Sequence, residues 1–165
     1  MKPVWAIGGI LALIAVGGAG LLASTKQITT PVIRENLRAD RLAQIHELVP
    51  HHRYDNDLLE DTIQVRDQAH LGTSDPVTIY RARKAGKPVA VAFQAVAPDG
   101  YNGRIVLLLA IWADGDLAGV RAVAHQETPG LGDRIETSKS DWIKQFNGHS
   151  LGDPPLGKWK VAKDG

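Results

Sequence analysis

The chain has 165 residues, which is enough for one domain of ordinary size with an appendage. Its formal net charge is +1, and Lys and Arg form no basic stripe, so a nucleic-acid partner is not expected. Because the chain contains no cysteine, disulfides, thiolate metal sites and cysteine nucleophiles are excluded.

The N-terminal segment is long and apolar. Residues 3–25 contain no charged residue, and residues 4–23 are almost wholly apolar. About 20 helical residues are needed to cross the roughly 30 Å hydrocarbon core of a bilayer. Trp5 lies near one end of the segment, where an indole ring prefers the membrane interface. We therefore predict a cytoplasmic tail of residues 1–3 and a transmembrane helix over residues 4–25.

A cleaved signal peptide is the alternative interpretation of this segment. The apolar region of a signal peptide has about 7–15 residues and is followed by an A-x-A-like cleavage site. The run here is longer, and residues 23–25 (A-S-T) match that site poorly. Lys2 and the terminal amine favour retention of the tail in the cytoplasm by the positive-inside rule. The expected location is the bacterial inner membrane, with a single span in the lipid bilayer and the remaining chain in the periplasm.

Residues 26–50 are predicted to form a separate amphipathic helix. Thr30 and Pro31 have the pattern of a helix start, with threonine as the N-cap and proline at the first helical position. Apolar residues then recur at roughly helical spacing until Pro50, with charged residues of both signs between them. We expect this helix to cover one face of the domain that follows. A membrane-surface helix is the weaker alternative, because its charged face is mixed in sign.

The segment after Pro50 is rich in histidine and acidic residues. His51 and His52 are candidate metal ligands, but no second cluster occurs at ligand spacing. The acidic residues of 55–61 lack the glycine and the spacing of a calcium loop. We therefore predict a solvated polar connection here and no metal site.

The pattern changes to strands from residue 77 onward. Residues 105–113 form a continuous apolar run, which predicts a strand buried on both faces at the centre of a sheet. In the preceding strand, Ala90, Ala92 and Gln94 form a small face that allows a helix or a ligand to approach closely. The predicted strands are residues 77–83, 89–95, 105–113 and 117–125, with turns at 84–87, 98–103 and 114–115.

Residues 140–146 are predicted to form a short helix, with Ser140 as its N-cap and Asn147-Gly148 after its end. Trp159 and Val161 indicate the start of a further strand. Together these elements predict an α+β fold, in which a twisted antiparallel sheet is packed with helices.

A glycine-rich loop, residues 127–132 with the sequence E-T-P-G-L-G, follows the last predicted strand. Pro129 and two glycines favour a loop whose backbone takes conformations closed to other residues and approaches a ligand closely. Glu127 and Thr128 add an acceptor and a hydroxyl at its entrance. His125 forms either an acid–base pair or a surface ion pair with Glu127. No nucleophile–base pattern occurs in the sequence, so no catalytic residue is assigned.

The E-T-P-G-L-G loop and the G-Y-x-G sequence at residues 100–103 resemble those of one flavin-binding family. This family is the G subunit of the Rnf (also called Rsx) electron-transport complex, with the C subunit of the sodium-pumping quinone reductase as a relative. The resemblance covers most of the chain in order, from the membrane helix to the short helix that contains Trp142. E-T-P-G-L-G is fairly specific in this setting, whereas G-Y-x-G alone is not.

The resemblance implies that residues 51–165 are a periplasmic FMN-binding domain. In this family FMN is attached through its phosphate to a threonine of an S/T-G-A-T motif, and the last threonine here, Thr137, does not lie in one. The attachment site is therefore expected just beyond Gly165, and the domain is expected to be truncated at its C-terminus. The residues expected to bind flavin are Gly100, Tyr101, Glu127, Thr128, Gly130, Leu131, Gly132 and Trp142.

In this arrangement Leu131 and Trp142 would flank the flavin ring. Glu127, Thr128 and backbone N–H groups of the loop would form hydrogen bonds with its polar edge. The structural alternatives are that Trp142 is a plain core residue and that Glu127 and Thr128 only stabilise a turn.

The function implied by the resemblance is electron transfer through FMN in a complex that couples electron flow to ion movement across the membrane. Electrons would enter from NADH or ferredoxin on other subunits, against which the membrane helix would dock. No complete active site is expected in this subunit. The alternatives are a component like the C subunit of the quinone reductase, and a non-redox envelope module that binds a ligand or partner without a cofactor.

Overall fold

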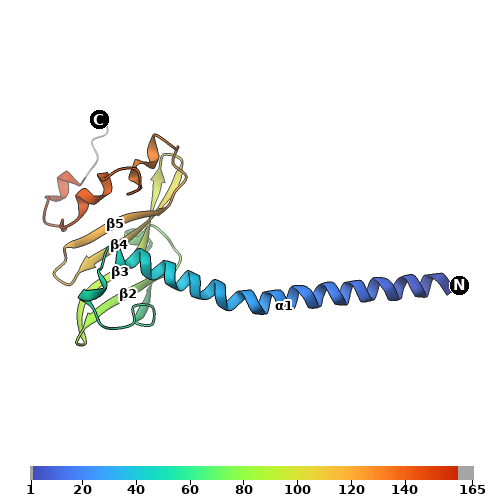
Figure 1. Ribbon diagram of the computed structural model, residues 1–165. Helices are drawn as coiled ribbons and strands as arrows, with labels where there is room; N and C mark the ends of the chain where they lie inside the picture. The colour runs from blue at the N-terminus through green and yellow to red at the C-terminus, as the bar shows by residue number, and fades with distance from the viewer. Residues whose placement is uncertain (1, 160–165) are drawn as a thin grey trace. The chain divides into compact units, whose positions relative to one another are not determined.

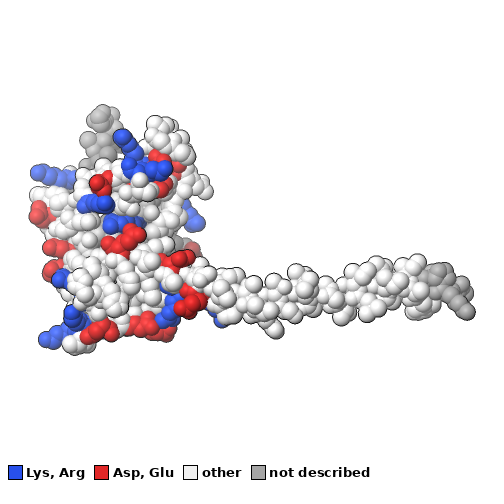
Figure 2. Space-filling model, viewed as in Figure 1, with Lys and Arg blue, Asp and Glu red and all other residues white. Residues whose placement is uncertain are grey.

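The computed structural model describes residues 2–159, which divide into two compact units between Arg41 and Leu42 (Figure 1). Helix α1 (Lys2–His46) supplies the whole of the first unit. Within the described part of the chain, α1 is the one helix long and apolar enough to cross a membrane. Its large apolar side chains from Trp5 to Leu37 are exposed, and Figure 2 shows most of its length without charge, whereas Lys, Arg, Asp and Glu are interspersed on the second unit. A surface of this kind suits the hydrocarbon core of a bilayer.

The predicted helix start at Thr30-Pro31 is wrong, because α1 continues through Pro31. The Thr30 hydroxyl donates backward to the carbonyl oxygen of Lys26 at 2.6 Å, instead of accepting from an N–H group ahead of it as an N-cap does. The Thr29 hydroxyl donates to the carbonyl oxygen of Thr25 at 2.9 Å. Neither hydroxyl bonds to the carbonyl oxygen of Gln27, which is the one that loses its N–H donor because residue 31 is proline.

In the second unit, the described residues form one antiparallel sheet of five strands in the order β1-β2-β3-β4-β5. Strands that are consecutive in sequence are neighbours in the sheet, as short connections require. Ala85 and Gly86 form the turn between β2 and β3, both with positive φ. The strands are β1 (Thr62–Val65), β2 (Val77–Lys84), β3 (Lys87–Gly100), β4 (Gly103–Trp112) and β5 (Leu117–Ala124).

The predicted α+β fold and its antiparallel sheet are confirmed, and the four predicted strands correspond to β2 to β5. The sequence pattern does not predict β1, because a strand of 4 residues is too short to show an alternation. It pairs with β2 at one edge of the sheet.

The core lies on one face of the sheet, where the end of α1 packs. The small face predicted for β3 is confirmed, since Ala90 and Ala92 are buried against this core. Gly119 of β5 extends the small surface: a Cβ atom there would lie 2.8 Å from Cδ2 of Leu48. The core residues are Ile45, Leu48, Val49, Tyr54, Leu58, Tyr80, Ala82, Ala90, Ala92, Leu108 and Ala110.

The opposite face of β4 is only half-buried, so the prediction that residues 105–113 are buried on both faces is wrong for the described residues. Leu107, Leu109 and Ile111 line an apolar hollow of about 370 Å³ on that face. The segment that lies over it contains the 3-10 helix η3 (Trp142–Phe146) and continues to Trp159, and it leaves the hollow open.

A short helix was expected over residues 140–146, and the structure has the 3-10 helix η3 over Trp142–Phe146. The prediction that Ser140 is the N-cap is wrong, because Asp141 holds that position, although Oγ of Ser140 accepts a hydrogen bond from the N–H of Trp142 at 3.0 Å. The strand expected from Trp159 to Val161 falls almost wholly outside the described residues. The other short helices are η1 (His51–Arg53), α2 (Gln68–Leu71), η2 (Gly132–Ile135) and η4 (Leu156–Lys158).

The polar segment after Pro50 is not simply a solvated connection. Asp61 accepts hydrogen bonds from Nε of Arg81 at 2.7 Å and from Nε of Arg83 at 2.9 Å, which tie the segment to β2. Desolvation raises the pKa of the Asp61 carboxyl, but the hydrogen bonds from Arg83 and Arg81 outweigh it and lower this pKa below its ordinary value. Among the described residues, no three His, Cys, Asp or Glu side chains are placed to hold a metal ion.

Candidate functional site

The two motifs lie at the same end of the sheet. Gly100 and Gly103 pair at the tip of the β3–β4 hairpin, with Tyr101 and Asn102 as the turn between them. Because β4 and β5 are antiparallel, the beginning of β4 lies beside the end of β5, and Val106 pairs with Ala124. The loop that follows β5 is therefore brought next to the hairpin tip.

Asn102 joins the hairpin tip to the loop. Its backbone N–H donates to Oε1 of Glu127 at 3.2 Å, and its side-chain Nδ2 donates to Oγ1 of Thr128 at 2.8 Å. Sequence reasoning does not single out Asn102, because asparagine in a turn has an ordinary local role. Its position between the two glycines of G-Y-x-G is the only signal that could have found it.

The Glu127 side chain lies against two of the glycines. A Cβ atom at Gly100 would lie 2.9 Å from Oε1 of Glu127 and 2.2 Å from the carbonyl oxygen of Gly103. A Cβ atom at Gly132 would lie 2.7 Å from Oε2 and 2.8 Å from Cβ of Glu127. Gly100 and Gly132 thus leave room for this side chain, while Gly130 is needed for its positive φ of 82°.

Hydrogen bonds inside the loop hold its backbone in one shape. The carbonyl oxygen of Thr128 accepts from the N–H groups of Leu131 at 3.1 Å and Gly132 at 3.0 Å. The N–H of Gly130 donates to Oδ1 of Asp133 at 2.8 Å. Asp133 is the one buried acidic side chain among the described residues, and this bond gives it a structural role.

His125 contacts Glu136, so the expected pairing of His125 with the Glu127 carboxylate is wrong. Nε2 of His125 lies 3.1 Å from Oε1 of Glu136. The backbone N–H of Glu127 donates to Nδ1 of the same ring at 3.2 Å, which leaves the proton of a neutral imidazole on Nε2. Residues at 125 and 127 lie beyond the end of β5, so the alternation of a strand no longer determines their directions.

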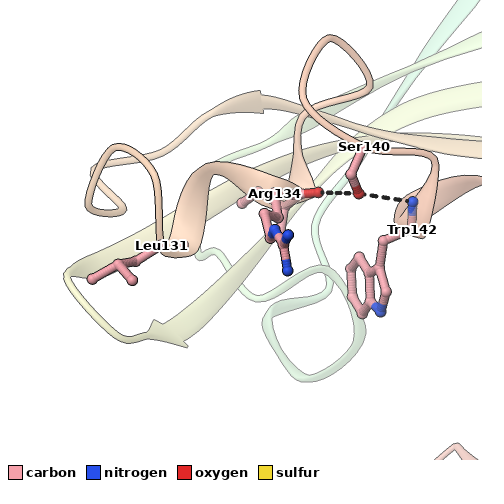
Figure 3. Close-up of a pocket in the computed structure, with 6 residues that line it drawn as sticks. Leu131, Arg134, Ser140 and Trp142 are labelled. Carbon is pink, nitrogen blue, oxygen red and sulfur yellow. Dashed lines mark hydrogen bonds between the residues drawn. The ribbon is translucent and has the colours of Figure 1, made fainter.

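The loop and the segment after it line a surface hollow of about 370 Å³, here called the Trp142 hollow (Figure 3). Ser140 lines the hollow, and its Oγ donates to the carbonyl oxygen of Arg134 at 3.0 Å and accepts from the N–H of Trp142 at 3.0 Å. The lining residues are Leu131, Gly132, Arg134, Ile135, Ser140 and Trp142.

The structure places three of the expected flavin-binding residues in the lining of the Trp142 hollow and the others outside it. Leu131, Gly132 and Trp142 line the Trp142 hollow, and the side chains of Leu131 and Trp142 are 76% and 51% exposed. Trp142 also meets Phe146 edge-on at 5.3 Å between ring centroids. Tyr101, at the hairpin tip, is 93% exposed and is not among the lining residues. The junction between the hairpin and the loop is formed by Gly100, Glu127 and Thr128. The bend of the loop is formed by Gly130.

The residues of the hollow suit a flavin ring. Such a ring needs largely apolar walls with a few placed polar groups. Leu131, Ile135 and Trp142 supply the apolar walls, and Arg134 supplies hydrogen-bond donors. Arg134, Ile135 and Ser140 are lining residues that sequence reasoning missed, although all three lie within ten positions of the motif.

Comparison with known families gives two matches, one near each end of the chain. Residues 100–164 match the FMN-binding domain, and residues 1–48 match the RnfG N-terminal region. The match to the FMN-binding domain contains the hairpin tip, the loop and the Trp142 hollow. The fold and the site thus define a flavoprotein with FMN as its cofactor and an N-terminal helix that could span a membrane.

Relatives of known name cover nearly the whole chain. It is 44% identical to the G subunit of the ion-translocating oxidoreductase complex of Shewanella baltica, over 99% of this chain and 77% of that protein. It is 47% identical to the G subunit of the same-named complex in Pseudomonas aeruginosa, over 94% of this chain and 73% of that protein. The chain therefore belongs to the family of G subunits of ion-translocating oxidoreductase complexes.

Proposed function

We propose that this protein carries electrons through FMN as a subunit of a membrane complex that couples electron transfer to ion translocation. The observation that carries the proposal is that the FMN-binding domain match includes both motifs, which the structure joins through Asn102. The names of the relatives support the complex and its ion-translocating activity. The other subunits of the complex are the expected partners, with electron entry from NADH or ferredoxin on those subunits.

The flavin ring is proposed to lie in the Trp142 hollow, with Leu131 and Trp142 on either side of it. Bound FMN supplies the redox chemistry, and the protein determines its position and surroundings. Glu127, Thr128 and the glycines at 100, 130 and 132 hold the loop in shape beside the ring. Tyr101 is exposed at the hairpin tip, where it is proposed to contact the ring or a partner.

The flavin is proposed to be attached covalently. The resemblance supports attachment of the FMN phosphate to a threonine of an S/T-G-A-T motif just beyond Gly165. A tether at that point would hold the phosphate near the C-terminal segment and leave the ring to be positioned by the protein surface.

The domain is proposed to lie in the periplasm. A tail of residues 1–3 would remain in the cytoplasm, residues 4–25 would span the inner membrane, and residues 26–50 would connect the span to the FMN-binding domain at residues 51–165. The apolar exposed surface of α1 supports a membrane position for its first part, and the short tail with Lys2 supports the orientation.

The test is the intact mass of the full-length protein together with in-gel flavin fluorescence. A fluorescent band, with a mass excess equal to FMN joined with loss of water, is expected. A non-fluorescent protein with unmodified mass would contradict covalent attachment, and failure to bind added FMN as well would contradict electron transfer through this subunit. Protease treatment of spheroplasts tests the orientation, because a periplasmic domain is cleaved in intact spheroplasts and a cytoplasmic one is protected.

A further inference from the structure

The loop has few hydrogen-bond donors left for a ligand. The N–H groups of Gly130, Leu131 and Gly132 donate within the loop itself, to Oδ1 of Asp133 and to the carbonyl oxygen of Thr128. The Glu127 carboxylate accepts from Asn102 and is in any case not a donor. A flavin in the Trp142 hollow therefore finds no free backbone N–H group at residues 130–132.

Few side chains of the hollow can donate a hydrogen bond to a ligand. Ser140 already donates to the carbonyl oxygen of Arg134 and accepts from the N–H of Trp142. Of the described residues that line the hollow, Arg134 is the one charged residue. Its exposed side chain extends between Leu131 and Trp142 in Figure 3. It carries five N–H donors in a planar fork.

The carboxylates next to Arg134 in sequence are engaged with other groups. Asp133 accepts from the N–H of Gly130 and lies 3.9 Å from Nζ of Lys139. Glu136 contacts His125 through Oε1 and accepts from the Ser138 hydroxyl through Oε2. The positive charge in the hollow is therefore available to a ligand.

We propose that Arg134 donates hydrogen bonds to the pyrimidine edge of the flavin, at N1 and the C2 carbonyl oxygen, and favours the reduced ring. This inference rests on the proposed position of the flavin in the Trp142 hollow. The oxidised ring is neutral, whereas a ring that has taken up two electrons and one proton carries a negative charge along that edge. A guanidinium beside it stabilises the reduced form more than the oxidised form, and so raises the reduction potential.

The test compares three variants of the full-length, flavin-loaded protein: Arg134→Gln, Arg134→Lys and Arg66→Gln. Arg66 is exposed and does not line the hollow, so its replacement makes the same change in net charge without touching the site. The midpoint potential of the flavin is measured by spectroscopic titration with dithionite. Arg134→Gln is expected to weaken binding of the reduced ring about tenfold relative to the oxidised ring, which lowers a two-electron potential by about 30 mV.

The midpoint potential of the Arg134→Lys protein is expected to lie close to that of the unchanged protein. The midpoint potential of the Arg66→Gln protein is expected to equal it. Equal potentials in Arg134→Gln, Arg66→Gln and the unchanged protein would overturn the proposed contact. A separate control tests the proposed position itself: if loading with flavin leaves Trp142 fluorescence unchanged, the ring does not lie in the hollow and the proposed function has to be revised independently of Arg134.

Discussion

The Glu127 carboxylate accepts a hydrogen bond from the backbone N–H of Asn102 at 3.2 Å, across 25 positions of the sequence. This bond fastens the loop after β5 to the tip of the β3–β4 hairpin. It gives Glu127 a structural role that its place in a ligand-binding motif does not reveal. The glycines on either side of it, Gly100 and Gly132, leave the space that its side chain occupies.

Glu127→Ala should loosen the junction between the loop and the hairpin tip. It removes the acceptor for Asn102, and a hydrogen bond to a charged group contributes about 1.5–3 kcal/mol where it is well shielded and less at a half-exposed site such as this. Faster hydrogen exchange of the Asn102 amide is the expected result. Glu127→Gln keeps an oxygen acceptor of the same reach and should restore much of the protection. Equal exchange in the alanine variant and the unchanged protein would show that the bond does not hold the junction.

Gly132→Ala should destabilise the domain because its Cβ overlaps the Glu127 side chain. Overpacking of this kind costs about 1–3 kcal/mol. In a Glu127→Ala background the 2.7 Å contact with Oε2 is gone and the 2.8 Å contact with Cβ remains, so the same substitution should cost less, but not nothing. Urea unfolding of the two single variants and the double variant measures this coupling. Gly152→Ala is the matched control, since a Cβ there meets nothing within 4 Å. Additive effects of Gly132→Ala and Glu127→Ala would argue against the contact.

Asp61→Asn should make the domain less stable at neutral pH and reduce its sensitivity to acid. The pKa of Asp61 is lower in the folded protein than its ordinary value near 3.8, because Arg83 and Arg81 donate to the carboxylate. A lowered folded pKa contributes stability that is present above the unfolded value and is lost as the pH falls through the folded value. The difference between the two proteins should therefore be largest near pH 7 and shrink below about pH 4.

Thermal unfolding of Asp61→Asn and of the unchanged protein, measured at pH values from 7 to 2, gives this difference in stability. Asp75→Asn is the control, because Asp75 is an exposed aspartate of the same domain whose backbone N–H donates to Oγ1 of Thr73. A constant difference between Asp61→Asn and the unchanged protein across the whole range would contradict the assignment.

Trp142→Phe should remove most of the fluorescence change that accompanies flavin loading. The chain contains 4 tryptophans, of which Trp142 lines the proposed flavin site. A flavin ring beside it should quench its emission, whereas phenylalanine preserves the apolar wall and the contact with Phe146. Emission of the flavin-free and flavin-loaded proteins is compared, with Trp112→Phe on β4 as the control. If flavin loading quenches the tryptophan emission of Trp142→Phe as strongly as that of the unchanged protein, the flavin lies elsewhere.

Much of this molecule can be predicted from local sequence patterns. The long run without charge predicts a helix of membrane length, and the strand alternation and turn residues predict β2 to β5 with nearly correct ends, except that β3 continues to Gly100 and does not end at residue 95. These predictions succeed because period and turn chemistry act over a few neighbouring residues. Thr30-Pro31 misleads for the same reason: its local pattern is that of a helix start, yet the hydroxyl bonds backward within a continuing helix.

The sequence by itself determines the membrane-length helix, the antiparallel order of β2 to β5 and the presence of two glycine-containing motifs. Only the tertiary structure decides that these motifs meet, that Glu127 accepts from Asn102, and that Arg134 reaches the same hollow as Trp142. The physical reason is the antiparallel pairing of β4 with β5, which places the start of one strand beside the end of the other. Contacts across 25 positions depend on that pairing register, and no local pattern carries it.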